Sequence, residues 1–479
     1  MAERQEITVL PSPAILSSSS AALHRSLLAT GLGHEATISH LNETIVPGLN
    51  QSSRSSRYYG FVTGGCTPSA LAADKIVSAY DQNVSVHLPN ESITTEVEDA
   101  ALRMLIELLD LGGGWEHRIF TTGATASNIL GLACGREAVV KWAGEKKGVE
   151  VSVAKHGLLQ AMKRVGMEEL RVLTCDEHSS LRKACSVVGL GHDAVVNVGR
   201  AGRASGFDFN KLEQELSVAG RKSIIAVSCA EVNTGLFATR GKDDMERIRR
   251  LADEHGAWVH VDAAFGLMAR VLDDAEEFAT IKKGVEGMEL PDSITGDGHK
   301  LLNVPYDCGF FFSRHLGIGE QVFQNPGAPY LSTSAASIPS PLSIGLENSR
   351  RFRALPVYAN LISFGKQGFR EMLARQIRFS RRIARYMMES EAFELLPPSE
   401  QLDADPISLT YMIVLFRAKD GAVNGDLIKR INDQRRIYCS GTRWGGKPAV
   451  RFAVSNHQVD IERDWLVVKE VLDSAILNN

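Results

Sequence analysis

The sequence lacks any apolar run of the roughly 18 residues that a membrane-spanning helix needs, so no membrane segment is expected. It also lacks a basic excess, because 53 Lys and Arg residues are outnumbered by 57 Asp and Glu residues, for a net charge of -4. No basic cluster is present, and nucleic acid is therefore not an expected partner. The first residues carry Glu3 and Glu6 and no signal-peptide core, which makes the cytoplasm the expected compartment of a soluble globular protein.

Cysteines are few and scattered. Their number is odd, and no pair has C-x-x-C or metal-ligand spacing, so we expect reduced thiols, no disulfide and no metal site. The seven positions are 66, 134, 175, 185, 229, 308 and 439.

With 479 residues, the chain is too long for one compact core and fits a large domain plus a smaller one. Residues 1–57 are irregular and Ser-rich, and we expect an N-terminal arm there. Residues 58–347 form the expected large domain. From residue 348 to 479 the pattern changes to a long helix followed by strands and helices, which predicts a smaller α+β domain.

Apolar, β-branched runs alternate with amphipathic segments through the large domain. This pattern predicts an α/β fold with a mostly parallel sheet that is covered by helices on both faces. Expected strands lie at 118–123, 171–175, 194–199, 223–231 and 257–264, and expected helices begin at Ser127, Ser179, about Phe209 and residue 243; the smaller domain has expected strands at 408–418, 436–441 and 449–456.

One lysine stands at the start of an apolar segment. In "SITGDGHKLLNVPYDCGFFF" (293–312), Lys300 separates small polar residues from a run that ends in three phenylalanines. A lysine loses much solvation free energy when it leaves water unless its charge is used or neutralised. This position therefore calls for a chemical role.

Three further motifs follow expected strands, where functional groups of such sheets gather. Asp262 ends "WVHVD", although a carboxylate there can also be a turn or helix cap. "TTGATASN" (121–128) suits an anion held at a helix N-terminus, although Ser127 can be only an N-cap. His178 follows another strand, and a lone histidine in that place is more often structural.

Together these features match the needs of pyridoxal 5'-phosphate. A lysine amine binds the cofactor aldehyde as a Schiff base, a carboxylate keeps the pyridine nitrogen protonated, a helix N-terminus holds the phosphate, and a flat side chain stacks on the ring. We therefore interpret Lys300 as the Schiff-base lysine, Asp262 as the partner of the ring nitrogen and His178 as the stacking residue.

Several motifs resemble the group II pyridoxal-phosphate-dependent amino-acid decarboxylases, which include aromatic-amino-acid, histidine, glutamate and cysteine-sulfinate decarboxylases. The resemblance runs from Tyr58 to Asn456 and is carried by "TTEVED" (94–99), "DEHSS", "HVDAAFG", "GHK" and "VRFAVSN". It implies fold type I with a seven-stranded-type sheet. It also implies a homodimer with active sites at the subunit interface, where the N-terminal arm packs on the partner.

Further site residues are implied by the same resemblance. Ala264 would pack on the second face of the cofactor ring, and Ala124, Thr125 and Ser127 would hold the phosphate. His299 would lie beside the phosphate or the substrate carboxylate. In "CAEVNTG" (229–235), Glu231 and Asn233 stand near the cofactor where relatives often have threonines.

Substrate contacts are predicted from two stretches. "YYGFVTGGCTP" (58–68) matches the substrate-side loop of the family, so Tyr59, Phe61 and Thr63 are candidates, although the apolar ones can equally be core residues. "SGTRWGGKP" (440–448) is expected to form a hairpin whose Arg443 either binds the substrate carboxylate or is a solvated loop arginine.

The expected function is decarboxylation of an L-amino acid to an amine and CO2. Aromatic-type relatives carry a catalytic loop tyrosine shortly before an "RRFR"-like element, but here residues 334–349, which precede "RRFR" (350–353), contain no tyrosine. Tyr330 is the nearest candidate for the proton donor, and a packing role beside Pro329 is equally open. An aldehyde synthase, an aminotransferase, an aldolase and a non-catalytic cofactor-binding protein remain alternatives.

Overall fold

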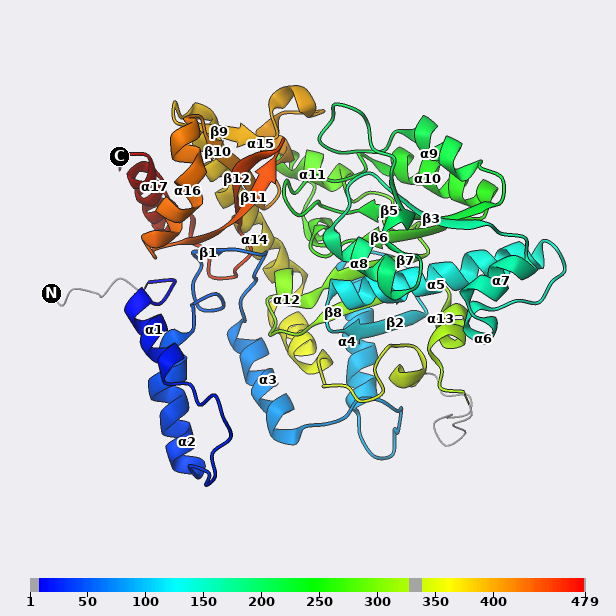
Figure 1. The fold of residues 1–479 in the computed structure, drawn as a ribbon, viewed down its shortest axis with the longest axis horizontal. Helices are drawn as coiled ribbons and strands as arrows, with labels where there is room; N and C mark the ends of the chain where they lie inside the picture. Colours follow the sequence, from blue (N-terminus) through cyan, green and yellow to red (C-terminus); the bar gives the residue numbers. More distant parts are fainter. Residues whose placement is uncertain (1–7, 327–337, 478–479) are drawn as a thin grey trace.

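The computed structural model describes residues 8–326 and 338–477. Two sheets organise the chain, and Figure 1 shows a larger α/β body, a smaller unit that contains the C-terminus, and an N-terminal pair of helices that extends from both. No helix within the described ranges has the length and apolar character that crossing a bilayer requires.

The large sheet has seven strands in the order β2-β8-β7-β6-β5-β3-β4. Only β8 runs antiparallel to its neighbours, so the sheet is mixed and mostly parallel, as the sequence predicts. Its strands are β2 (His117–Thr121), β3 (Glu169–Thr174), β4 (Val195–Asn197), β5 (Arg221–Ser228), β6 (Trp258–Asp262), β7 (Ser293–Asp297) and β8 (Gly309–Ser313).

Strand β7 has the unusual sequence "SITGD", yet all five residues are buried. Its polar side chains are satisfied within the fold, because Ser293 accepts a hydrogen bond from the Trp258 indole at 2.9 Å. Central strands of a sheet covered on both faces can carry such polar residues only when they have partners.

Helices cover both faces of this sheet (Figure 1). The long helix α5 packs closely because Gly131 and Gly135 leave room for the side chains of His260 and Trp258. The large-domain helices are α3 (Pro68–Tyr80), α4 (Thr94–Leu108), α5 (Ala124–Glu145), α6 (Val153–His156), α7 (Leu158–Arg164), α8 (Ser179–Val187), α9 (Phe209–Leu216), α10 (Lys242–His255), α11 (Ala279–Lys283), α12 (Gly298–Leu301) and α13 (Leu316–Phe323).

The smaller sheet has the order β1-β11-β12-β10-β9. Its edge strand β1 (Tyr58–Tyr59) lies at the start of the expected large domain but pairs in parallel with β11. The other elements are α14 (Ala354–Glu389), β9 (Phe393–Leu396), α15 (Pro406–Leu409), β10 (Ile413–Ala418), α16 (Gly421–Asp433), β11 (Tyr438–Trp444), β12 (Lys447–Ala453) and α17 (Ile461–Leu477). The expected hairpin is present, and its turn is made by Gly445 and Gly446, both with positive φ.

Two of the motifs quoted above meet in the interior of the fold and join residue 350 to the expected large domain. Glu98 of "TTEVED" and Arg350 of "RRFR" form a buried ion pair at 2.8 Å. Arg350 also donates to the carbonyl of Phe120 at 2.7 Å. Removal of either residue would leave the other charge buried without a partner, which is strongly destabilising. We therefore assign these residues to structure and not to catalysis.

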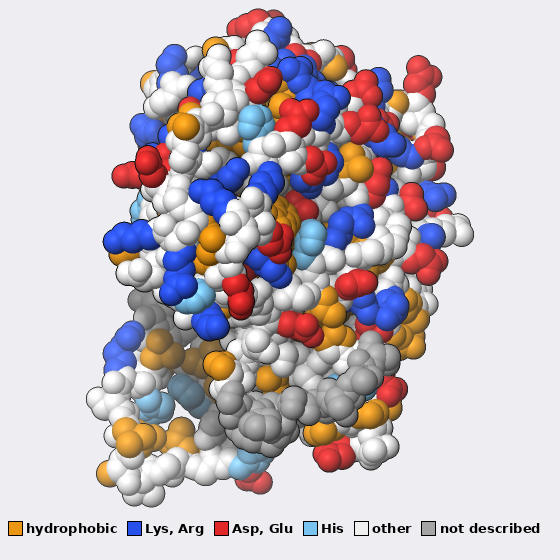
Figure 2. Space-filling model, turned by 90° about the vertical axis from the view of Figure 1, so that its right-hand side faces the viewer, with side chains coloured by type: hydrophobic (Ala, Val, Ile, Leu, Met, Phe, Trp, Pro, Cys, Tyr) orange, Lys and Arg blue, Asp and Glu red, His pale blue; other side chains and the backbone are white. Residues whose placement is uncertain are grey.

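The N-terminal arm consists mainly of α1 (Pro13–Ala21) and α2 (His34–His40), and neither helix has a buried residue. Large apolar side chains are exposed along it, and they stand on the lobe at the lower left of Figure 2. They include Ile15, Leu16, Leu23, Leu27, Leu28, Leu32, Ile38 and Leu41.

Candidate active site

The predicted residues converge at one edge of the large sheet, where its parallel strands end. Asp262 is the last residue of β6, and the adjacent strand β7 ends at Asp297. The one-turn helix α12 follows directly and carries Lys300. Helix α5 begins beside the same edge, since the backbone N–H of Ala124 donates to Asp297. The carboxyl ends of parallel strands share one edge, which explains why segments so distant in sequence meet here.

The Lys300 amine is held by a neighbouring carboxylate. Its Nζ lies 3.0 Å from Asp297 Oδ2, and the lysine side chain is 16% exposed. The same Nζ lies 5.5 Å from the ring centroid of Phe265. The ion pair explains how the ammonium group is tolerated at the start of an apolar segment.

The backbone of Lys300 is fixed by a glycine from a distant segment. A Cβ at Gly64 would lie 1.7 Å from the Lys300 carbonyl oxygen, so no side chain can be accommodated there. The neighbouring Thr63 carbonyl accepts a hydrogen bond from Ser455 at 3.0 Å, just beyond β12. The lysine segment is thereby clamped between the chain that follows β1 and the end of the small sheet.

A chain of hydrogen bonds joins Asp262 to His178. The Asn128 amide donates to Asp262 Oδ2 at 2.8 Å and to the Ser180 hydroxyl at 3.1 Å. Ser180 in turn contacts His178 Nδ1 at 2.6 Å. Burial lowers the pKa of His260, which contacts the Asn128 oxygen at 2.9 Å, to about 4. The neutral imidazole therefore adds no positive charge beside Asp262 at neutral pH, and the carboxylate stays available to a cationic partner.

The N-terminus of α5 already holds an anion. The N–H of Ala124 donates to Asp297 Oδ1 at 2.6 Å, directly after the N-cap Gly123. Thr125 is partly exposed, and its hydroxyl has no hydrogen-bond partner within the described residues. Ser127 differs, because it is fully buried and its hydroxyl contacts Thr121 at 2.7 Å. Backbone N–H groups and Thr125 are therefore the better placed phosphate donors.

His299 lies beside the N-terminus of α5. Its Nε2 is 3.6 Å from Asp297 Oδ1, and its Nδ1 accepts from the Cys308 N–H at 3.2 Å. Burial lowers the pKa of the His299 imidazole, and the Asp297 carboxylate opposes that shift. The Tyr306 ring packs on the imidazole with a centroid distance of 4.4 Å. In a neutral His299, Nδ1 is the acceptor, so Nε2 carries the hydrogen and can donate it toward the N-terminus of α5.

Two predicted residues lie elsewhere, and a third cannot be placed because it is outside the described residues. Tyr59 is fully buried in the core of the small domain, where its ring stacks on Phe452, so it cannot touch a substrate. Arg443 is exposed on β11, as the alternative of a solvated arginine expects. Tyr330 lies outside the described residues.

The remaining predicted residues are Asn233, Phe61, Thr63 and Ala264, and of these Asn233 lies in the loop that follows β5. Asn233 donates to Glu231 at 3.0 Å and accepts from Thr442 of β11 at 2.9 Å. Phe61 is 61% exposed and has φ of 59°, a conformation that is rare for a phenylalanine. Thr63 is buried, and Ala264, which follows Asp262 by two residues, is partly exposed.

Sequence reasoning missed Asn128, Asp297 and Arg451. Arg451 of β12 is 6% exposed, and its Nη1 donates to the Val232 carbonyl at 2.8 Å. Burial lowers the pKa of Arg451, and the nearby Glu231 opposes that shift. All three lie inside quoted motifs. For Asn128 and Arg451, a polar residue on the buried face of an expected helix or strand was the signal that could have found them, whereas Asp297 ends β7, which was not an expected strand.

These residues fit pyridoxal phosphate on structural grounds. The site combines a shielded lysine amine, the Asp262 carboxylate, for which the described residues provide no ion-pair partner, and a helix N-terminus that already binds a carboxylate as it would a phosphate. No cluster of three or more His, Cys, Asp or Glu side chains suited to a metal is found in residues 8–326 and 338–477.

Comparisons with known proteins agree with this arrangement. Residues 25–404 match the sequence model of a family described as "Pyridoxal-dependent decarboxylase conserved domain". The L-2,4-diaminobutyrate decarboxylase of Acinetobacter baumannii is 27% identical over 338 residues, which cover 68% of this chain and 64% of that protein, slightly under two thirds of its length. The 3,4-dihydroxyphenylacetaldehyde synthase of Drosophila melanogaster is 24% identical, and the match covers 79% of this chain and 71% of that protein.

Solved structures share the fold. The crystal structure of Oryza sativa TDC with PLP and tryptamine superposes with a TM-score of 0.80 at 20% identity, covering 98% of this chain and 93% of that one. The match between the family and most of the sequence, together with the lysine, carboxylate and anion-binding helix end at one sheet edge, shows that the chain belongs to the pyridoxal-dependent decarboxylase family, whose cofactor is pyridoxal 5'-phosphate.

Proposed function

We propose that this protein is a pyridoxal-phosphate-dependent decarboxylase that removes the α-carboxylate of an L-amino acid and releases an amine and CO2. The observation that carries the proposal is the convergence of Lys300, Asp262 and the N-terminus of α5 at one edge of the large sheet. When bound, the cofactor supplies an aldehyde that combines with amines and a ring that accepts the electron pair left by departing CO2.

Each residue of the chain has a defined part in this proposal. Lys300 would bind the cofactor through its amine, and Asp262 would keep a proton on the ring nitrogen because a partly buried carboxylate favours a cationic partner. The α5 N–H groups, Thr125 and His299 hold the phosphate. His178 and Ala264 bracket the ring, and the bonds through Ser180 and Asn128 fix the distance between His178 and Asp262.

On the substrate side, we propose that Arg451 attracts a carboxylate of the amino acid. Its guanidinium is buried, and its Nε has no hydrogen-bond partner within the described residues. Phe61, exposed on a left-handed backbone, would contact the substrate side chain. Strained backbone of this kind concentrates at binding sites.

Aldehyde formation is a second candidate outcome. After CO2 leaves, the former α-carbon must gain a proton, and without a positioned acid it can react with O2 instead. That path consumes the amino acid, O2 and water, and yields CO2, aldehyde, ammonia and peroxide. The absence of tyrosine from residues 334–349 favours it, and relatives of this chain include an aldehyde synthase.

Tyr306 is a further candidate acid besides Tyr330 and His178. Its phenol is 59% exposed and its ring packs on His299, beside the Lys300 segment. Tyr58 lies nearby, and its burial, with smaller contributions from Tyr438 and Tyr306, raises the Tyr58 pKa to about 12. A phenol with so high a pKa is a poor acid at neutral pH, so we do not propose Tyr58 as the donor.

A product assay tests the function directly. The cofactor-loaded protein is incubated with single L-amino acids while CO2, amine, aldehyde, peroxide and keto acid are measured. We expect at least one amino acid to release CO2, with amine and aldehyde together equal to the CO2. Formation of a keto acid without CO2 would show an aminotransferase and end the decarboxylase proposal.

The same assay locates the acid. We expect Tyr306→Phe to raise the peroxide-to-amine ratio several-fold, because the ring contact with His299 stays while the proton is lost. Tyr330→Phe and Tyr438→Phe are run beside it. A ratio that rises only in Tyr330→Phe would assign the acid to Tyr330 instead.

We also propose a homodimer in which the arm of residues 1–57 packs on the partner. The arm exposes apolar side chains on helices with no buried residue, and α3 also exposes Leu71, Ile76 and Tyr80. Such a large apolar surface is typical of an obligate interface.

Removal of the arm should therefore break the assembly. We expect a chain lacking residues 1–49 to be monomeric in light scattering after size exclusion and to lose most of its activity, since the proposed active sites lie at the interface. Leu16→Asp with Ile38→Asp should weaken the dimer, whereas Thr30→Asp should leave it intact. A truncated chain that stays dimeric would refute the proposed role of the arm.

A further inference from the structure

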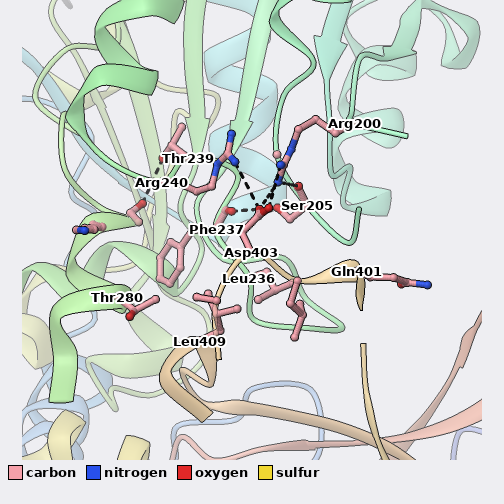
Figure 3. A pocket seen from close by; sticks show the side chains of 15 residues that line it. Arg200, Ser205, Leu236, Phe237, Thr239, Arg240, Thr280, Gln401, Asp403 and Leu409 are labelled. Carbon is pink, nitrogen blue, oxygen red and sulfur yellow. Dashed lines mark hydrogen bonds and ion pairs between the residues drawn. The ribbon is translucent and has the colours of Figure 1, made fainter. Parts of the chain in front are cut away.

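A cavity whose lining includes none of the lysine-site residues lies between the large and the small domain. It has a volume of about 210 Å³. Figure 3 shows Leu236, Phe237 and Thr280 of the large domain facing Leu409 of the small domain across it. A cavity of this size fits a small organic molecule and not a nucleotide or a peptide.

The walls of this cavity are largely apolar. Leu236 is buried, and the Phe237 ring packs directly on the backbone of Gly284, where a Cβ would lie 2.4 Å from it. Leu402 and Leu409 complete the small-domain side. An occupant therefore needs an apolar body.

One end of the cavity is cationic. Asp403 forms ion pairs with three arginines, to Arg200, to Arg203 at 3.9 Å and to Arg240 at 3.5 Å. Asp244 pairs with Arg240 at 3.6 Å, so three positive charges face two negative ones. The cluster therefore has a net charge of +1.

The Arg240 side chain is 43% exposed, so a ligand can reach its N–H groups by displacing water. Its guanidinium makes the two long ion pairs but no hydrogen bond to another described residue, and Figure 3 shows it at the cavity with Arg200 and Asp403. A planar guanidinium with free N–H groups is the preferred partner of a carboxylate or a phosphate.

The cavity is connected to the lysine site by packed rings. Phe237 contacts Tyr411 at a centroid distance of 5.6 Å, and Tyr411 stacks on Phe265 at 6.3 Å and donates to its carbonyl. Phe265 is the ring beneath Lys300 Nζ. A second connection runs from Ser205, which lines the cavity and donates to Asp176, two residues before His178.

We propose that this cavity is a regulatory site for a small organic anion with an apolar body, and that its occupancy alters the lysine site through Phe237, Tyr411 and Phe265. The anion binds Arg240, and the apolar body lies among Leu236, Phe237 and Leu409. Because the walls come from both domains, a bound anion also ties the domains together. Contact alone does not prove coupling, so binding and coupling are measured separately.

Binding is tested with phenylacetate by ligand-observed NMR on the cofactor-loaded protein. A molecule of this size is expected to bind with a Kd of about 1 mM. Arg240→Gln should weaken it about tenfold, since a charge-assisted hydrogen bond is lost. Thr280→Trp, which fills the cavity, should abolish saturable binding. Phenylacetamide is uncharged, so its affinity for the unmodified protein should be no higher than the affinity of phenylacetate for Arg240→Gln.

Lys282→Gln is the matched control. It also removes a positive charge, but Lys282 pairs with Asp274 and does not line the cavity, whereas its neighbour Lys283 does. Its affinity for phenylacetate should equal that of the unmodified protein. Arg451→Gln tests whether phenylacetate binds at the lysine site instead of the cavity. If it binds in the cavity, this substitution should not weaken it. Equal affinity in the unmodified protein, Arg240→Gln and Thr280→Trp would overturn the proposal.

Coupling is read from the bound cofactor. Saturating phenylacetate should change the rate of cofactor dissociation at least about twofold, and the change should vanish in Arg240→Gln and shrink in Phe237→Leu. Binding without any change in the dissociation rate would refute the regulatory part. These readouts need no substrate, so they fail or succeed independently of the decarboxylase assignment.

Discussion

Replacement of Lys300 by alanine is expected to abolish catalysis and the covalent attachment of the cofactor. The lysine is the amine held at the sheet edge by Asp297, and no other lysine within the described residues forms an ion pair with this carboxylate. Absorbance spectra should lose the band near the visible edge, and mass spectrometry after borohydride reduction should find no cofactor on the chain.

The control for this experiment is Lys300→Arg, which keeps a cation beside Asp297 but cannot form the covalent bond. It should be as inactive as Lys300→Ala, while Asp297 keeps its partner and the fold is less disturbed. If borohydride still fixes the cofactor to the chain in either variant, another lysine performs this role and the assignment is wrong.

The Asp262→Asn variant is expected to bind the cofactor and yet turn over roughly 10²- to 10³-fold more slowly, since a neutral amide cannot hold a proton on the ring nitrogen. Its oxygen can still accept the hydrogen bond from Asn128, so the connection to Ser180 and His178 should persist. Equilibrium dialysis of the cofactor and single-turnover rates measure the two effects separately.

Asp262→Glu provides the comparison, because it restores the charge at a shifted position and should recover part of the rate. A rate in Asp262→Asn close to that of the unmodified protein would remove this carboxylate from the chemistry. A loss of cofactor binding in Asp262→Asn without a change in rate per bound cofactor would reduce Asp262 to a binding residue.

Periodicity predicted five of the seven strands of the large sheet, because these carry local signals, and it did not predict β7 and β8. The runs around Val172, Ile225 and Val259 are apolar and β-branched, and the structure places strands at all three. The helix α5 begins at Ala124, earlier than the expected Ser127, because Asp297 caps its free N–H groups from another segment. No local pattern reports a cap that comes from a residue 173 positions away.

The parts of the site that were not predicted depend on non-local pairing. Tyr59 belongs to the small domain because β1 pairs with β11, which lies far along the chain. Its two-residue strand has no periodicity to detect. Asn128 is similar, since its importance comes from joining Asp262 and Ser180, and a sequence shows an asparagine without showing its neighbours.

Gly64 has a consequence for how this protein tolerates genetic variation. Its hydrogen points at the Lys300 carbonyl at a distance that excludes even the methyl group of alanine. Any single-base change that replaces it must move the backbone of Lys300 or the clamped segment. We therefore expect natural variants at this codon to be rare, although a glycine has no side chain that could act on a substrate.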